Sequence, residues 1–158
     1  VGLAKAGAVF CGEERTIPEL LAYFDGIGSG DAFRRMCILD AIILNTDRHY
    51  GNFGVLFDTE TLEVQGMAPV FDHNRSLLSE LDNDQLADPS WYLRRCKPRL
   101  GQDFIRNAKG LLTDDIRRDL MELKDFTFQQ HPRIHAEQER LDSLSRIVQG
   151  RIHLILSD

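Results

Sequence analysis

The segment Phe33 to Leu44 constrains this chain more than any other part of its sequence, because it is apolar on nearly all sides. Asp31 stands just before it as a helix N-cap, and Gly26, Gly28 and Gly30 separate it from the residues upstream. A helix that is apolar nearly all round must be buried by the rest of the molecule. With 158 residues, of which 42% are apolar, the chain can supply that core as one domain.

Caps and apolar spacing predict three further helices. A helix over about 16–25 begins with a capping box from Thr16 to Glu19. A helix capped by Thr113 is expected to end near Phe128. After about Pro132 a long amphipathic helix is predicted from apolar residues three and four apart: Leu141, Leu144, Val148, Ile152 and Ile155.

Two short strands are predicted in the middle of the chain. Residues 53–57 and 62–70 have strand character and are joined by a turn at 58–61, which predicts a β-hairpin. Residues 73–103 are polar and aperiodic, so a long irregular segment should follow. The fold class is therefore α+β and predominantly helical.

Composition excludes several classes of protein. No apolar run approaches the ~20 residues of a membrane span, and no signal peptide is visible. Cys11, Cys37 and Cys96 form no C-x-x-C pair, which favours a reducing, cytoplasmic location. The first residue is Val1 rather than Met, which suggests a trimmed chain.

The acidic charge is concentrated in residues 31–90, which hold eleven Asp and Glu against four Lys and Arg. This distribution disfavours direct binding of nucleic acid, whose phosphates it would repel. A cluster of carboxylates is also typical of a divalent-cation site, where the metal makes the local field positive toward an anionic substrate.

The polar segment between the buried helix and the first strand carries the most chemical information. Asp47 can accept a proton from an attacking hydroxyl, and Asn52 can offer its amide oxygen to a metal from the far end of the same loop. Asp72, just past the second strand, supplies an acidic metal ligand. A base and two oxygen ligands around a nucleotide-bound Mg²⁺ are what phosphoryl transfer requires.

Two motifs together resemble those of the HipA-like serine/threonine kinases. They are Asn45-Thr-Asp-Arg-His-Tyr-Gly-Asn-Phe53, similar to the family's catalytic loop, and Ala68-Pro-Val-Phe-Asp72, similar to its metal-binding segment. The phosphoinositide kinases carry a related D-R-H-x-x-N loop. The resemblance implies that Asp47 is the catalytic aspartate, that Asn52 and Asp72 bind magnesium, and that His49 is a catalytic-loop residue that braces the site.

The same resemblance implies the organisation and the partners of the protein. Residues 16–158 would form the C-terminal lobe of a kinase-like fold, with the hairpin carrying the site, and residues 1–15 would connect it to an N-terminal lobe. ATP and Mg²⁺ are the implied cofactors, and a protein hydroxyl is the implied phosphate acceptor. The N-terminal lobe of the same chain or of a partner and an antitoxin-like regulator are further implied partners, whereas nucleic acid and membrane are not.

Two features depart from kinase patterns. His73 stands after the metal-binding aspartate, where the family commonly has an apolar residue. Protein kinases also use a glycine-rich loop and a strand lysine in an N-terminal lobe, whereas Lys5 is the only lysine here before Lys97.

Other interpretations remain open for the same residues. Asp47 and Asn52 are also typical turn residues, and Asp72 can cap a loop. His49 fits a structural role, Arg48 a surface or carboxylate-pairing role, and the run 94–99 a solvated loop or a surface for an acidic partner.

Two other functions are therefore considered beside a kinase. One is a nucleotide-binding pseudokinase or toxin-like regulator that acts through protein contacts. The other is a metal-dependent phosphohydrolase built on Asp47, His49, Asp72 and His73.

Overall fold

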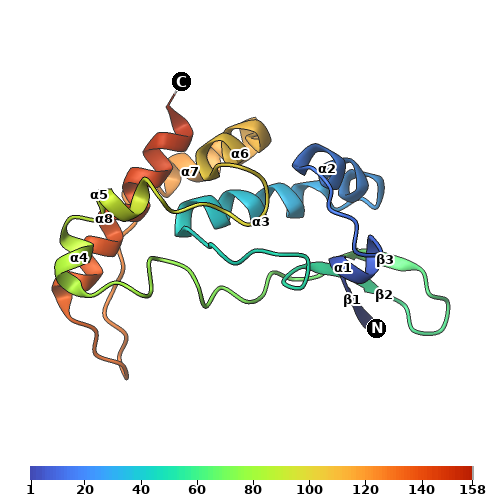
Figure 1. The fold of residues 1–158 in the computed structure, drawn as a ribbon, viewed down its shortest axis with the longest axis horizontal. Coiled ribbons are helices and arrows are strands. Elements are labelled where there is room, and N and C mark those ends of the chain that lie inside the picture. The colour runs from blue at the N-terminus through green and yellow to red at the C-terminus, as the bar shows by residue number, and fades with distance from the viewer. Residues whose placement is uncertain (158) are drawn as a thin grey trace.

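The computed structural model describes residues 1–157, which contain eight helices and one three-stranded sheet (Figure 1). In chain order the elements are β1 (Gly2–Lys5), α1 (Ala6–Val9), α2 (Ile17–Gly26), α3 (Gly30–Ile43), β2 (Gly54–Phe57), β3 (Val64–Met67), α4 (Asn83–Ala87), α5 (Ser90–Leu93), α6 (Phe104–Leu111), α7 (Asp114–Glu122) and α8 (Gln138–Leu156). The predicted α+β, mainly helical class is confirmed.

Helix α3 is the buried centre of the molecule, as its apolar sequence predicts. It packs against α2, α6 and α8, and Figure 1 shows it running through the middle with the sheet near one end and α8 near the other. Phe33 on α3 stacks on Phe24 of α2, with ring centroids 5.0 Å apart, and Phe53 lies against both rings. This aromatic cluster fixes the start of β2 relative to α3, and the loop between them carries the predicted site.

The sheet is antiparallel with the order β1-β2-β3. The β2–β3 hairpin was predicted. The third strand of the sheet, β1, was not, because residues 1–15 were expected to be only a connector. β1 pairs with β2 from Gly2 opposite Phe57 to Lys5 opposite Gly54. Gly54 permits this close approach, since a Cβ there would overlap the carbonyl oxygen of Ala4. A four-residue strand without a strong alternating pattern gives little signal in the sequence.

The helical expectations are largely confirmed, with four differences. α3 begins at Gly30 after Ser29, so Asp31 lies in its first turn and is not the predicted N-cap. The capping box of α2 is present, with Thr16 Oγ1 accepting from Glu19 N–H and the Glu19 carboxylate accepting from Thr16 N–H. The helix capped by Thr113 ends at Glu122 rather than near Phe128, whose N–H instead donates to Ser145 Oγ at 2.9 Å. α8 begins at Gln138, and α6, capped by Asp103, was not predicted.

Residues 73–103 are mostly without regular structure, as expected, apart from the short helices α4 and α5. The strand predicted over 62–70 is shorter, since β3 ends at Met67. Within residues 1–157, none of the helices combines the length and the apolar character that crossing a membrane requires. Cys11, Cys37 and Cys96 are all unpaired thiols.

Candidate functional site

The loop after α3 is fixed by hydrogen bonds at its first turn. Leu44 ends the helix in a left-handed conformation, and the N–H of Asn45 donates to the Asp40 carbonyl oxygen at 3.0 Å. The Asn45 side chain donates to Asp40 Oδ1 at 2.9 Å, and its Oδ1 accepts from the Asp47 N–H at 3.1 Å. The buried asparagine therefore sets the backbone position of Asp47 relative to the core helix.

Arg48 joins the loop to α3 and to the segment after the sheet. Its side chain is 1% exposed and forms a two-bond ion pair with Asp40, with Nε–Oδ2 at 2.8 Å and Nη2–Oδ1 at 2.9 Å. Nη1 donates to the carbonyl oxygens of Asn52 at 2.6 Å and Phe71 at 2.7 Å. Nη2 also lies 3.0 Å from His73 Nε2. One guanidinium thus brings the two ends of the predicted site together.

The carboxylate of Asp47 faces solvent, with 24% of its side chain exposed, and is paired with Arg99. Arg99 Nη1 donates to Oδ1 at 2.8 Å, while His49 Nε2 lies 4.0 Å from Oδ2. The hydrogen bond from Arg99 is the main reason that the pKa of Asp47 lies below its ordinary value, and the charges of His49, Arg99 and Arg75 act in the same direction. Asp47 is therefore ionised at neutral pH and can accept a hydrogen bond from a hydroxyl.

His49 is oriented by its own loop. The N–H of Gly51 donates to His49 Nδ1 at 2.9 Å, so a neutral imidazole carries its proton on Nε2, the nitrogen on the side of Asp47. A Cβ at Gly51 would come within 2.7 Å of the His49 ring, so this position favours glycine. The arrangement supports a bracing contact more directly than proton transfer by the histidine.

Asn52 and Asp72 present oxygen atoms near this junction. The Asn52 side-chain nitrogen donates to the Asp47 carbonyl oxygen at 3.0 Å, and among residues 1–157 no group donates to Asn52 Oδ1. Asp72 directly follows Phe71, whose carbonyl oxygen is bound by Arg48. Its side chain is exposed, and its φ of 59° is a left-handed conformation that aspartate tolerates better than most residues.

This donor set fits a hard cation. Mg²⁺ prefers oxygen ligands and is commonly held by one or two protein groups together with substrate phosphates and water. Within the described residues, no group of three or more His, Cys, Asp and Glu side chains forms a metal cluster. Asn52 and Asp72 fit a magnesium ion that arrives with a nucleotide better than a metal held by protein alone.

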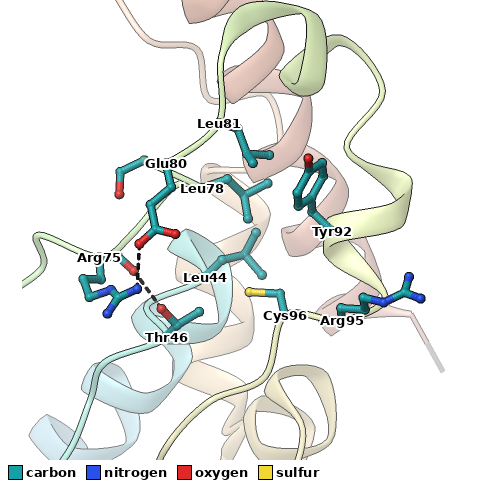
Figure 2. A pocket seen from close by; sticks show the side chains of 10 residues that line it. Leu44, Thr46, Arg75, Leu78, Glu80, Leu81, Tyr92, Arg95 and Cys96 are labelled. Atoms are coloured by element: carbon teal, nitrogen blue, oxygen red, sulfur yellow. Dashed lines mark hydrogen bonds and ion pairs between the residues drawn. The ribbon is translucent and has the colours of Figure 1, made fainter.

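Two cavities flank the loop. One, of about 240 Å³, is lined by Thr46, Arg75 and residues of the segments 78–81 and 92–96 (Figure 2). The other, of about 460 Å³, includes Arg48, His49, Gly51 and Arg99 among its lining. Asp47 lies next in sequence to residues of both cavities.

Two residues of the site were missed by the sequence analysis. Asp40 is a lone carboxylate within an otherwise apolar stretch of α3, and that isolation is a signal of a buried partner. Arg99 lies 52 residues from Asp47, and nothing in the sequence singles it out from its basic neighbours. Arg48 pairs with a carboxylate, which was one of the roles considered for it.

The fold is similar to that of a known kinase. The chain matches the crystal structure of the Helicobacter pylori proinflammatory kinase CtkA with a TM-score of 0.66, over 98% of this chain and 70% of that chain. The sequences are 16% identical, so the match shows a distant, kinase-like similarity of fold. No protein-family model matches the sequence. A search of curated proteins also finds no match.

Proposed function

We propose that this chain carries the catalytic loop and the metal ligands of a HipA-like serine/threonine kinase, which uses Mg²⁺ and ATP to phosphorylate a protein hydroxyl. The observation that carries the proposal is the position of Arg48. Its Nη1 donates to the carbonyl oxygens of both Asn52 and Phe71, at 2.6 and 2.7 Å. This places the peptide before Asp72 beside the end of the loop. The kinase-like fold supports the same interpretation.

Asp47 would orient the acceptor hydroxyl. It is ionised, half-buried and attached to a loop that the buried Asn45 fixes, so it can accept the hydroxyl hydrogen bond without rearranging the backbone. His49 Nε2–H lies on the side of Oδ2 and would keep the carboxylate in position. Because phosphoryl transfer depends chiefly on position and charge, a weakly basic aspartate is sufficient.

Asn52 Oδ1 and the Asp72 carboxylate would hold magnesium. When bound, the ion would neutralise negative charge on the phosphates during transfer. Arg99 adds a positive charge on the open side of Asp47, where an anionic group of the substrate would approach. In this proposal, residues 16–158 form the C-terminal lobe and residues 1–15 lead from an N-terminal lobe.

The first experiment tests the metal ligands without requiring turnover. Mn²⁺ replaces Mg²⁺ at such sites and broadens NMR signals close to it, so it should broaden those of Asn52 and Asp72 in the presence of ATP. Asp72→Asn keeps a residue that tolerates the left-handed backbone but removes the charge, and it should weaken the broadening. Glu60→Gln, an exposed carboxylate in the β2–β3 turn, is the matched control and should have no effect.

Phosphoryl transfer to a protein hydroxyl is then measured with the full-length natural protein and its Asp47→Asn variant. Transfer that depends on Asp47 supports a kinase. Metal and nucleotide binding without any transfer would replace the proposal with a nucleotide-binding regulator. Metal-dependent phosphate release that needs no ATP would replace it with a phosphohydrolase.

A further inference from the structure

We propose that the 240 Å³ cavity beside Thr46 binds an apolar side chain of the acceptor protein, and that the basic segment 94–99, of which Arg95 and Cys96 line this cavity, binds acidic residues of the same peptide. The substrate class is then an acidic serine- or threonine-containing segment with a large aliphatic residue beside the acceptor. This inference rests on the proposed kinase function, and it adds the substrate's chemistry to it.

The cavity has an apolar floor and a polar mouth. Figure 2 shows Leu44, Leu78 and Leu81 on one side and Tyr92 and Cys96 on the other, as the apolar part of the lining. The volume of about 240 Å³ lies below the ~300–1,000 Å³ of ordinary ligand and cofactor pockets. It suits a large side chain better than a whole nucleotide.

The walls of the cavity are held in place. The N–H of Leu77 donates to the Ile43 carbonyl oxygen at 2.6 Å, which ties the segment before Leu78 to the end of α3. Tyr92 OH accepts from Gln85 Nε2 at 2.7 Å, and Arg75 pairs with Glu80 at 2.6 Å along one side of the cavity. The cavity is therefore preformed, which lowers the entropy cost of binding.

The position of the cavity relative to Asp47 points to the acceptor peptide. Thr46, which precedes Asp47, lines the cavity, and its N–H donates to the Arg75 carbonyl oxygen at 3.2 Å. Arg75 is close enough to Asp47 for its charge to affect that carboxylate. In an extended peptide, neighbouring residues are ~3.4 Å apart along the chain, so a residue near the acceptor hydroxyl can reach this cavity.

The rim supplies positive charge in an acidic protein. Arg94, Arg95 and Lys97 form no ion pair in the part of the chain that the structure describes, and Arg95 lies 4.1 Å above the ring of Trp91. Trp91 is 53% exposed, whereas tryptophan side chains are highly buried on average. An exposed aromatic ring that carries an arginine is typical of protein-binding hot spots.

A buried arginine lies close to the rim of the cavity. Arg151 is 9% exposed, its Nη2 has no hydrogen-bond partner, and it is close enough to Cys96 for each to affect the pKa of the other. Its Nε donates to the Ala41 carbonyl oxygen at 2.9 Å, and Arg151 lines a neighbouring cavity beside α4, α5 and α8 rather than this one. Carboxylates of a bound peptide would compensate the charges of the rim.

The chain contains a single tryptophan, so the fluorescence of Trp91 reports directly on this surface. The probe is a short peptide without Trp or Tyr, in which leucine stands beside serine and glutamates flank the pair. Adding it to the 158-residue chain should change Trp91 emission in a saturable way. Replacing the leucine by asparagine or the glutamates by lysines should remove the effect, and added salt should weaken binding.

Two substitutions locate the peptide on the surface. Ser79→Phe fills the mouth of the cavity from an exposed position and should weaken binding about tenfold or more, as loss of an apolar side-chain site does. Thr59→Phe in the β2–β3 turn is its control. Arg95→Glu should weaken binding through charge repulsion, whereas Lys124→Glu, which makes the same change beyond α7, should not.

The outcomes separate this inference from the proposed function. Peptide binding that stays equally strong when the leucine is replaced, or in the Ser79→Phe variant, would overturn the inference, even if Asp47-dependent transfer is present. So would a response of Trp91 to vesicles of anionic lipid in place of the peptide, since it would assign the surface to a membrane. Specific peptide binding without phosphorylation by the natural protein would leave the peptide site standing and reject the kinase.

Discussion

Arg48 and Asp40 form a doubly hydrogen-bonded ion pair inside the protein, with the arginine side chain 1% exposed and the aspartate side chain 7% exposed. All three guanidinium nitrogens are engaged, because Nη1 also binds the two backbone carbonyls of Asn52 and Phe71. The pair is therefore more than a local contact: it connects the core helix with both halves of the candidate site.

Removing one partner of this pair should destabilise the fold strongly. Arg48→Met would leave the Asp40 carboxylate buried without its cation, and we expect a loss of about 3–5 kcal/mol in the free energy of unfolding. Denaturant unfolding followed by circular dichroism measures it. The control is Arg35→Met, because Arg35 also forms carboxylate ion pairs, with Asp31 and Asp119, but at the surface. There the loss should stay within about 1 kcal/mol.

Gly54→Ala tests the edge strand that the sequence did not reveal. The new Cβ would overlap the Ala4 carbonyl oxygen, so β1 must move away from β2 or the sheet must distort. We expect a loss of about 1–3 kcal/mol, comparable to overpacking elsewhere in proteins. Thermal unfolding measures it, and Gly110→Ala on α6, where a Cβ meets open space, is the control. Equal stability of Gly54→Ala and the parent chain would contradict the pairing.

The features that the sequence predicted are those with local signals. The capping box at Thr16 marks the start of α2, and the apolar run predicts the buried helix α3. The loop from Asn45 to Phe53 lies between α3 and β2, as predicted. Contacts distant in sequence were not predictable. The Arg99–Asp47 pair and the Arg48 bond to Phe71 depend on how the chain returns to the loop after the sheet, which no periodic pattern encodes.

Arg99→Ala should raise the pKa of Asp47 toward its ordinary value, because the hydrogen bond from Arg99 is the main cause of the lowered value. NMR titration of the Asp47 carboxyl carbon in the 158-residue chain measures it without any assay of activity. Arg94→Ala is the control, since Arg94 makes no contact with Asp47. An unchanged titration in Arg99→Ala would show that the pair does not persist in solution.

The same shift predicts how acid affects stability. A carboxyl whose pKa is lower in the folded state stabilises the fold above its unfolded-state pKa, and this contribution is lost as the pH falls through the folded value. Glu19, Asp47, Asp58 and Asp88 all have lowered pKa values. Stability should therefore fall in acid below the ordinary carboxyl range, and Arg99→Ala should reduce the part due to Asp47. Unfolding measured from neutral to acidic pH tests both.

Asp47→Asn should remove catalysis and keep the site intact. The amide has the same shape, and its oxygen can still face Arg99, but it cannot take a proton from the acceptor hydroxyl. We expect phosphoryl transfer by the full-length natural protein to fall by about a hundredfold or more, with ATP affinity little changed. Transfer is measured with labelled ATP and affinity by calorimetry. A variant with normal turnover would exclude Asp47 as the catalytic residue.

The 158-residue chain assayed by itself should bind Mg²⁺ and ATP weakly and transfer little phosphate. The ligands Asn52 and Asp72 are present, but the catalytic rate depends on phosphates that are aligned and shielded from water by a lysine and by backbone N–H donors. Lys5, the only lysine before Lys97, lies in β1 opposite Gly54, and residues 1–157 include no glycine-rich strand-loop-strand unit around it. Labelled ATP, Mg²⁺ and the acidic serine peptide provide the test, with Asp47→Asn as the blank. Robust transfer that Asp47→Asn abolishes would mean that the described residues already contain a complete site, with the phosphates held by groups such as Arg99 in place of a lysine.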